Sequence, residues 1–109
     1  MSLKAILDER ERLKKHLRDD ALKEVFRLSS LLRKRYSFET LYLFGSLPSG
    51  RFSRGSDIDL VIEGLKTEDF FKAYAFLIKE GRFRIDLKPF EDLSEDFRKR
   101  VLSGGMKIE

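Results

Sequence analysis

The stretch LYLFGSLPSGRFSRGSDIDLVIEG, residues 41–64, decides how this chain folds. It opens within an apolar and aromatic run from Thr40 to Phe44, which predicts a buried strand. Residues 45–56 are rich in Gly, Ser and Pro and predict a loop. Residues 57–63 predict a second strand, which ends at Gly64. We therefore expect two strands joined by a long loop in the middle of the chain.

The sequence before this stretch predicts helix. Residues from about 3 to 36 contain no Gly or Pro, and their apolar side chains recur at helical spacing. Asp19 and Asp20 are suitable caps for a second helix after a break, so one bent helix and two helices both remain open. Residues 1–36 also carry a net charge of +5, against −1 for the rest of the chain. This excess fits a solvated helix surface, an acidic partner or nucleic acid.

The sequence after this stretch predicts two helices and further strands. Thr67 is expected to cap a helix that reaches Glu80, and 83–88 predicts a third strand. Ser94 is expected to cap a last short helix, followed by a small terminal strand over 106–109. The side chains expected on the inner face of the 67–80 helix are Phe70, Phe71, Tyr74, Leu77 and Ile78.

This order of elements predicts an α/β (α+β) fold. We expect a small mixed sheet of three or four strands with helices packed on one face. The 109 residues suit one domain, with an N-terminal helical region over 1–36 and a catalytic core over 37–109.

The amino-acid composition limits the kinds of metal site, the cellular location and the source that we expect. The chain has no cysteine and a single histidine, His16, so thiolate metal sites are excluded and any metal must be bound by oxygen. No window is apolar enough for a membrane span, and a cytoplasmic location is expected. Asn, Gln and Trp are absent while Glu, Lys and Arg are abundant, which is typical of a thermophile.

Three aspartates are the candidate metal ligands. Asp57 and Asp59 are two positions apart at the start of a predicted strand, so their side chains point to the same face. Two carboxylates this close repel each other, and a divalent cation removes that repulsion. Asp86 interrupts the next apolar strand and is placed to complete the cluster. Taken alone, Asp86 would equally suit a salt bridge to Arg82 or Arg84.

The loop before Asp57 has the composition of a phosphate-binding segment. Gly45 and Ser46 directly follow a strand, where a glycine permits close approach of the backbone and a hydroxyl can donate a hydrogen bond. Gly50 and Gly55 allow the rest of the loop to turn. The combination of strand, Gly-Ser, loop, Ser-Asp-x-Asp and a later strand aspartate is far more specific than any one part.

At these residues the chain resembles the minimal nucleotidyltransferase (MNT) family of the DNA polymerase β superfamily. The resemblance covers about residues 36–109 and includes RIDLKPFEDLSEDFRKRVLSGGMKIE, residues 84–109. It implies ATP or another nucleoside triphosphate as substrate and two Mg²⁺ ions, with Mn²⁺ as an alternative. The implied metal ligands and catalytic residues are Asp57, Asp59 and Asp86, with Asp86 helping to deprotonate the attacking hydroxyl. The implied nucleotide-binding residues are Gly45, Ser46, Gly50, Arg51, Arg54 and Ser56.

One part of the motif departs from the family. Members commonly have Arg-Ala-Arg between the Gly-Ser and the next glycine, whereas this chain has Leu47, Pro48 and Ser49. Two cations expected near phosphate are therefore missing. Arg51 and Arg54 are the nearby candidates to replace them.

The resemblance also implies a partner. Similar proteins pair with HEPN-domain proteins as toxin and antitoxin, so we expect either adenylylation of such a partner or neutralisation by occlusion alone. Phe52 and Phe76 are candidate partner contacts. Nucleic-acid binding through the basic helical region and an antibiotic-modifying activity are weaker alternatives, no membrane partner is expected, and a homo-oligomer stays open.

Overall fold

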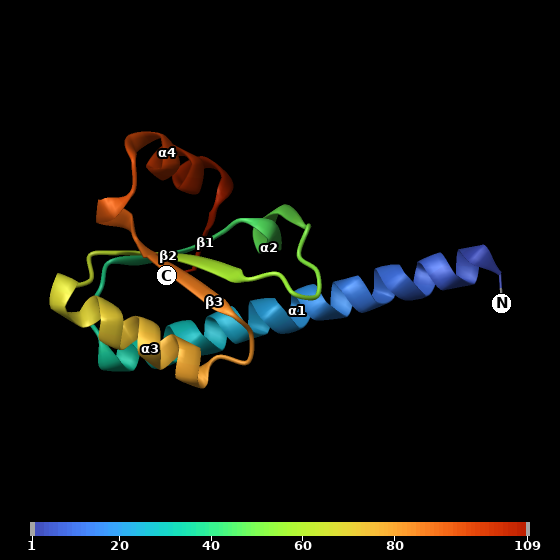
Figure 1. Ribbon diagram of the computed structural model, residues 1–109, viewed down its shortest axis with the longest axis horizontal. Helices are drawn as coiled ribbons and strands as arrows, with labels where there is room; N and C mark the ends of the chain where they lie inside the picture. Colours follow the sequence, from blue (N-terminus) through green and yellow to red (C-terminus); the bar gives the residue numbers. More distant parts are fainter. Residues whose placement is uncertain (1, 109) are drawn as a thin grey trace.

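The computed structural model describes residues 2–108 and contains a four-stranded sheet (Figure 1). The strands are β1 (Thr40–Phe44), β2 (Ile58–Glu63), β3 (Ile85–Pro89) and β4 (Met106–Lys107), in the spatial order β3-β2-β1-β4. Strands β2 and β3 are parallel, and the other two pairs are antiparallel. The predicted mixed sheet is therefore confirmed, including the short terminal strand, although Glu109 lies outside the described residues.

Helices account for most of the remaining chain. The four α-helices are α1 (Leu3–Arg35), α2 (Ser46–Ser49), α3 (Phe70–Glu80) and α4 (Glu95–Gly104), and two 3-10 turns are η1 (Thr67–Asp69) and η2 (Phe90–Asp92). Helix α1 is continuous, so no break occurs at Asp19 and Asp20. In the part of the chain described, no helix is both long enough and apolar enough to cross a membrane.

The main core lies between one face of the sheet and the helices α1 and α3, as Figure 1 shows below the sheet. The second half of α1 supplies side chains one turn apart, and alternate residues of the strands meet them. The fully buried members of this core are Ala21, Val25, Leu28, Leu32, Leu43, Ile58, Ile62, Ala73 and Leu77. The first half of α1 projects away from this core and is exposed from residue 2 to residue 16.

The opposite face of the sheet carries the alternate strand residues and is partly covered by η2 and α4. Tyr42 stacks on Phe90 with ring centroids 5.9 Å apart, and Phe44 lies 5.3 Å from Phe97. Tyr42 and Phe44 alternate with Leu43 along β1, so they point to the face of the sheet opposite to the one on which Leu43 is buried. The helices thus cover both faces, with α4 added to the face that also carries Asp59.

Two expectations for α3 are wrong. Phe71 is 80% exposed and Ile78 is 60% exposed, so neither belongs to the inner face. That face is centred on Ala73 and Leu77, and Phe71 and Ile78 are rotated away from it. Thr67 lies inside the preceding 3-10 turn and therefore does not cap the helix.

The aromatic residues proposed as partner contacts are not free surface groups. Phe52 is only 2% exposed, and its ring centroid is 6.1 Å from that of Phe83. Phe76 packs against the core, and the Arg35 guanidinium lies 4.5 Å above its ring. Its position in a Gly- and Ser-rich loop made Phe52 a candidate partner contact, but the side chain instead stabilises the loop by being buried.

A buried ion pair fixes α1 to the turn between α3 and β3. Glu24 is 4% exposed and accepts hydrogen bonds from the Arg27 side chain at 2.6 and 3.0 Å and from the backbone N–H of Arg82 at 2.5 Å. Arg27 also donates to the Glu80 carbonyl at 2.7 Å. The hydrogen bond from Arg27 is the largest cause of the lowered pKa of Glu24, against the opposing effect of burial.

Candidate functional site

Two of the three predicted aspartates are direct neighbours in the sheet. Asp59 of β2 and Asp86 of β3 are paired in the parallel register, so their side chains leave the same face at the same level. Both are half-buried. The sequence prediction that these carboxylates converge is therefore matched by the register.

The electrostatics of Asp59 reflect this crowding. Burial raises the pKa of Asp59 above its ordinary value, and the negative charge of Asp86 raises it further. Asp57 contributes in the same direction, whereas Lys88 opposes the shift. A group of carboxylates that disfavour each other's charge is the donor set that suits a hard divalent cation.

The third aspartate stands at the edge of this pair. Asp57 precedes β2 by one residue, and its Oδ1 forms an ion pair with the Arg84 Nε at 3.0 Å. Arg84 also donates to the carbonyl of Gly55, so it links the loop to β3. Asp86 pairs with Lys88 and not with Arg82 or Arg84. Lys88 is two positions from Asp86, and this same-face spacing was a signal from which the sequence could have identified the pair.

Within residues 2–108, no three acidic or histidine side chains stand in an arrangement ready to hold a metal ion. Arg84 and Lys88 instead occupy oxygens of Asp57 and Asp86. The chemistry of the three carboxylates fits Mg²⁺, but binding would require these two cations to withdraw. The pairs are largely solvent-accessible, and exposed pairs of this kind contribute only about 0–1 kcal/mol each.

Gly45 brings the loop backbone against Asp59. Its φ angle is +84°, and a Cβ built on it would stand 2.4 Å from the Asp59 Oδ2. Only glycine satisfies both the left-handed backbone and the close contact. Ser46 begins the single turn of α2 immediately after Gly45.

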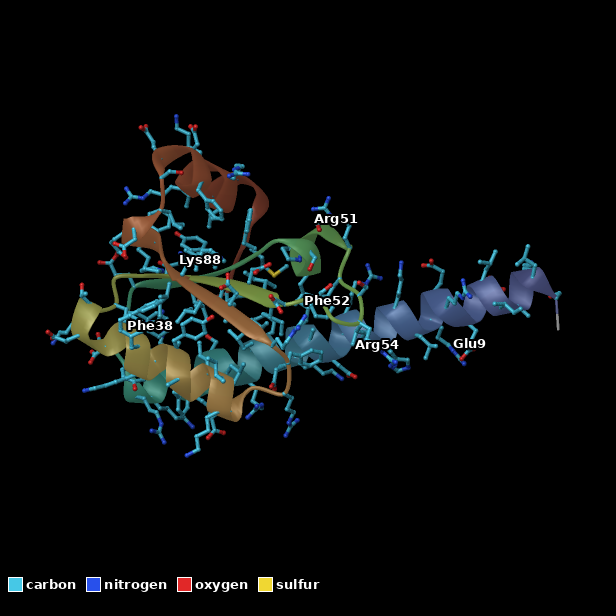
Figure 2. All side chains as sticks on the ribbon, viewed as in Figure 1. Glu9, Phe38, Arg51, Phe52, Arg54 and Lys88 are labelled. Carbon is cyan, nitrogen blue, oxygen red and sulfur yellow. The ribbon has the colours of Figure 1, made fainter. Side chains whose placement is uncertain are left out.

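The two arginines that follow α2 lie on different sides of the loop. The Arg51 Nε donates to the Ser49 Oγ at 3.2 Å, which holds the guanidinium beside Ser49. Gly50 ends α2 with φ +81°. Arg54 is exposed on the side of the loop that faces α1, away from Arg51 (Figure 2).

Ser56 closes a turn in the loop. Its Oγ accepts from the backbone N–H of Ser53 at 3.1 Å, and its own N–H donates to the Ser53 carbonyl at 2.9 Å. In this arrangement Ser56 shapes the loop that leads to Asp57. Its predicted contact with nucleotide stays a prediction.

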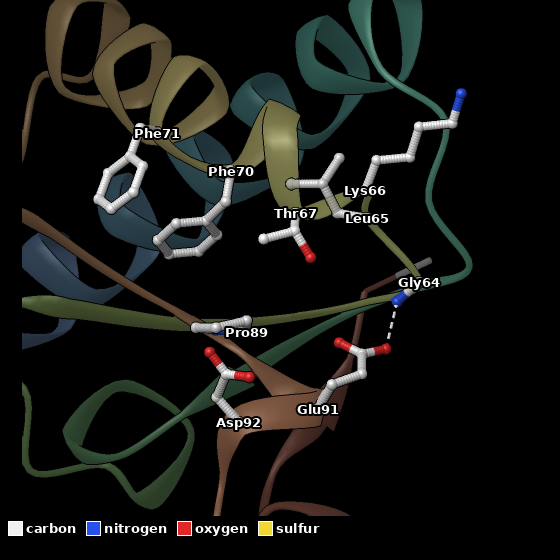
Figure 3. A pocket seen from close by; sticks show the side chains of 9 residues that line it. All are labelled: Gly64, Leu65, Lys66, Thr67, Phe70, Phe71, Pro89, Glu91 and Asp92. Atoms are coloured by element: carbon white, nitrogen blue, oxygen red, sulfur yellow. Dashed lines mark hydrogen bonds between the residues drawn. The ribbon is translucent and has the colours of Figure 1, made fainter.

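A further cavity lies at the other end of the strands (Figure 3). It has a volume of about 440 Å³ and is lined by residues 64–67, Phe70, Phe71, Pro89, Glu91 and Asp92. Glu91 accepts from the Gly64 N–H at 2.8 Å. Residues 64 and 89 end β2 and β3, whereas Asp59 and Asp86 lie near the beginnings of these strands, so this cavity is separate from the acidic pair.

Comparison with known proteins agrees with this geometry. Residues 25–108 match the nucleotidyltransferase domain family, and the chain belongs to that family. Among solved structures, it is similar to a toxin–antitoxin with AMP-PNP, with 23% identity, a TM-score of 0.65, and coverage of 80% of this chain and 71% of the other.

Two structures of the MntA–HpeT toxin–antitoxin are also similar. The match to a tyrosine-to-alanine mutant has 24% identity and a TM-score of 0.61, and it covers 74% of this chain and 68% of the other chain. The match to a double aspartate-to-glutamate mutant has 22% identity and a TM-score of 0.65, and it covers 76% of this chain and 70% of the other chain. No curated protein matches. The nucleotidyltransferase-like fold and the family resemblance are thus confirmed.

Proposed function

We propose that this protein binds ATP or another nucleoside triphosphate with Mg²⁺ and transfers a nucleoside monophosphate to a hydroxyl on a partner protein of the HEPN type. The observation that carries the proposal is the in-register pair Asp59 and Asp86 packed beside Gly45. Family membership supports nucleotidyl transfer. The AMP-PNP and the toxin–antitoxin partners named for the similar structures support the nucleotide and the kind of acceptor.

Each residue of the site has a role in this proposal. Asp57, Asp59 and Asp86 hold the metal ions, which when bound neutralise phosphate charge and make the hydroxyl more acidic. Gly45 and Ser46 contact the β- and γ-phosphates. The acceptor oxygen bonds to the α-phosphorus, the bond to pyrophosphate breaks, and Asp86 accepts the hydroxyl proton.

Arg51 replaces a missing family arginine. Its contact with Ser49 keeps a positive charge beside the Gly-Ser turn. Arg54 faces α1 and is the less suitable substitute (Figure 2). Arg51→Ala should therefore weaken nucleotide binding about tenfold, as expected for loss of one charge-assisted contact, and Arg54→Ala should weaken it less.

The test is transfer of label from ATP labelled at the α-phosphate to the HEPN-type partner in the presence of Mg²⁺. Asp86→Asn should reduce the rate by at least about 100-fold, since it removes the proton acceptor and a metal ligand. Asp92→Asn is the matched control, because Asp92 is an exposed acid at the far cavity. Equal label in both variants and the wild type would exclude the proposed role of Asp86.

A second function is neutralisation of the partner by occlusion without transfer. It is favoured by the ion pairs of Arg84 and Lys88 with two of the three aspartates and by the absence of a cation at Leu47 and Ser49. Neutralisation that persists in Asp86→Asn, with no label on the partner in the wild type, would establish occlusion.

A further inference from the structure

The N-terminal half of α1 is an unsupported helix. Residues 3–16, here called the arm, extend away from the folded body (Figures 1 and 2). At 1.5 Å per residue the arm spans roughly 20 Å. An isolated helix of this length is only marginally stable in water, so contact with another surface would stabilise it.

The arm carries an apolar stripe on one side. Leu3, Ile6, Leu7 and Leu13 follow helical spacing and are 71%, 37%, 48% and 58% exposed. Leu17 continues the stripe by packing against the core. Leu3, Ile6 and Leu7 are neighbours on this side, and Leu13 lies beyond Arg10. Exposed apolar side chains gathered on one side in this way indicate an interaction surface.

The stripe leads into a groove beside the loop that joins β1 to β2, here called the nucleotide loop (residues 45–57). A cavity of about 490 Å³ is lined from the loop by Ser53 and Arg54 and from α1 by Arg10, Leu13, Lys14, His16, Leu17 and the single acid Asp20. Arg54 is three residues before Asp57. A chain lying along the arm would therefore be directed toward the proposed site of transfer.

Charge indicates the kind of occupant. The arm contains five cations and three acids, a net charge of +2 without His16. A second copy of the arm would bring the same positive charge to the interface, whereas an acidic chain would neutralise it. The apolar stripe requires that this chain also present apolar side chains at helical spacing.

We infer that the arm and the groove at its base dock an acidic amphipathic helix of the acceptor protein, with its apolar face on the leucine stripe. This inference rests on the proposed function only in that the acceptor is a protein. Docking here would supply the acceptor-binding surface, because the arm is the extended surface that leads to the loop preceding Asp57.

The test uses the full chain and a fluorescent synthetic helix of three heptads, with Leu at its a and d positions and Glu at e and g. Anisotropy measures its affinity. Leu7→Ser combined with Leu13→Ser should weaken binding at least tenfold, because two half-exposed leucines lose their apolar contacts. Circular dichroism checks that the arm remains helical.

Two matched double variants test whether binding depends on which side of the arm carries the positive charge. Arg10→Gln with Lys14→Gln removes two charges from the groove, and Arg12→Gln with Lys15→Gln removes two from another side of the arm. The first variant should weaken binding about tenfold and the second less than threefold. Equal losses would overturn the inference by showing that only diffuse charge matters.

Other outcomes would also overturn it. A probe whose leucines are replaced by serine should not bind, and equal binding would remove the role of the stripe. An arm-dependent dimer measured by light scattering would assign the stripe to a second copy. Displacement of the acidic helix by RNA at equal concentration would assign the arm to nucleic acid.

Calorimetry of Mg-ATP binding separates this inference from the proposed function. The Leu7→Ser, Leu13→Ser variant should bind Mg-ATP as the wild type does. Loss of nucleotide binding in the wild type would refute the proposed function, while the peptide results would still decide whether the arm docks an acidic helix.

Discussion

Replacement of Gly45 by alanine should damage the site more than the fold. Its φ of +84° and ψ of −138° lie in a region that essentially only glycine adopts, which costs alanine about 1–3 kcal/mol, or roughly 5–15 °C in the melting temperature of a chain this size. The new Cβ would also stand 2.4 Å from the Asp59 Oδ2, and ordinary contact begins near 3.4 Å. The carboxylate must therefore move by about 1 Å, a displacement that can reduce a transfer rate about 100-fold.

Gly55→Ala provides the matched control. Gly55 has nearly the same backbone angle, φ +88°, but no atom lies within 4 Å of the position of its Cβ. Both variants should lose similar stability in thermal melts, and only Gly45→Ala should lose label transfer and Mg-ATP affinity. Equal functional losses in the two variants, or wild-type transfer by Gly45→Ala, would refute the argument that this glycine makes room for Asp59.

Three further outcomes follow from the charged groups. Glu24→Ala should lower the free energy of unfolding by about 2–3 kcal/mol in urea titrations, less than for a fully buried pair because Arg27 is about one-third exposed. Since the folded-state pKa of Glu24 is lowered, its stabilisation is present above its unfolded pKa near 4.3 and is lost as pH falls through the folded value; the acid melt of Glu24→Gln should lack this component. Asp59→Asn should raise the free energy of unfolding by about 0.5–1 kcal/mol by removing repulsion from Asp86, and should abolish metal-dependent ATP binding in calorimetry; a variant that is less stable yet still binds Mg-ATP would contradict the assignment.

The alternation of side chains along strands explains why the centre of the site could be predicted. Asp59 and Asp86 each interrupt an apolar strand on the parity opposite to the core residues, so any register that buries both strands sets the two carboxylates on one face. The parallel register then sets them side by side. The sequence alone does not predict which residues of β2 and β3 pair, but it does predict that both carboxylates lie on the same face of the sheet.

Prediction from sequence was weaker where a residue's environment comes from distant segments. Glu24 looks like an ordinary helix-surface acid, yet its partners include the Arg82 N–H, 58 positions away. Phe52 lies in a Gly- and Ser-rich loop but packs on Phe83. On α3, the five predicted residues fall within the arc of one amphipathic face, and only tertiary packing centres the buried face on Ala73 and Leu77 and leaves Phe71 exposed.

The departures from the MNT motif form a consistent design for the nucleotide loop. Leu47, which stands at one family arginine position, is 4% exposed and packs in the core, and Phe52 anchors the loop a few residues later. The segment between these two buried side chains turns at Gly50, and Arg51 folds back onto Ser49. Apolar anchors thus hold the loop in place before any phosphate binds, which reduces the conformational entropy that binding must overcome. Under the proposed function, packing alone positions the loop, so the Arg51 guanidinium would have only the phosphate charge to neutralise, whereas the two arginines of the family motif would do both.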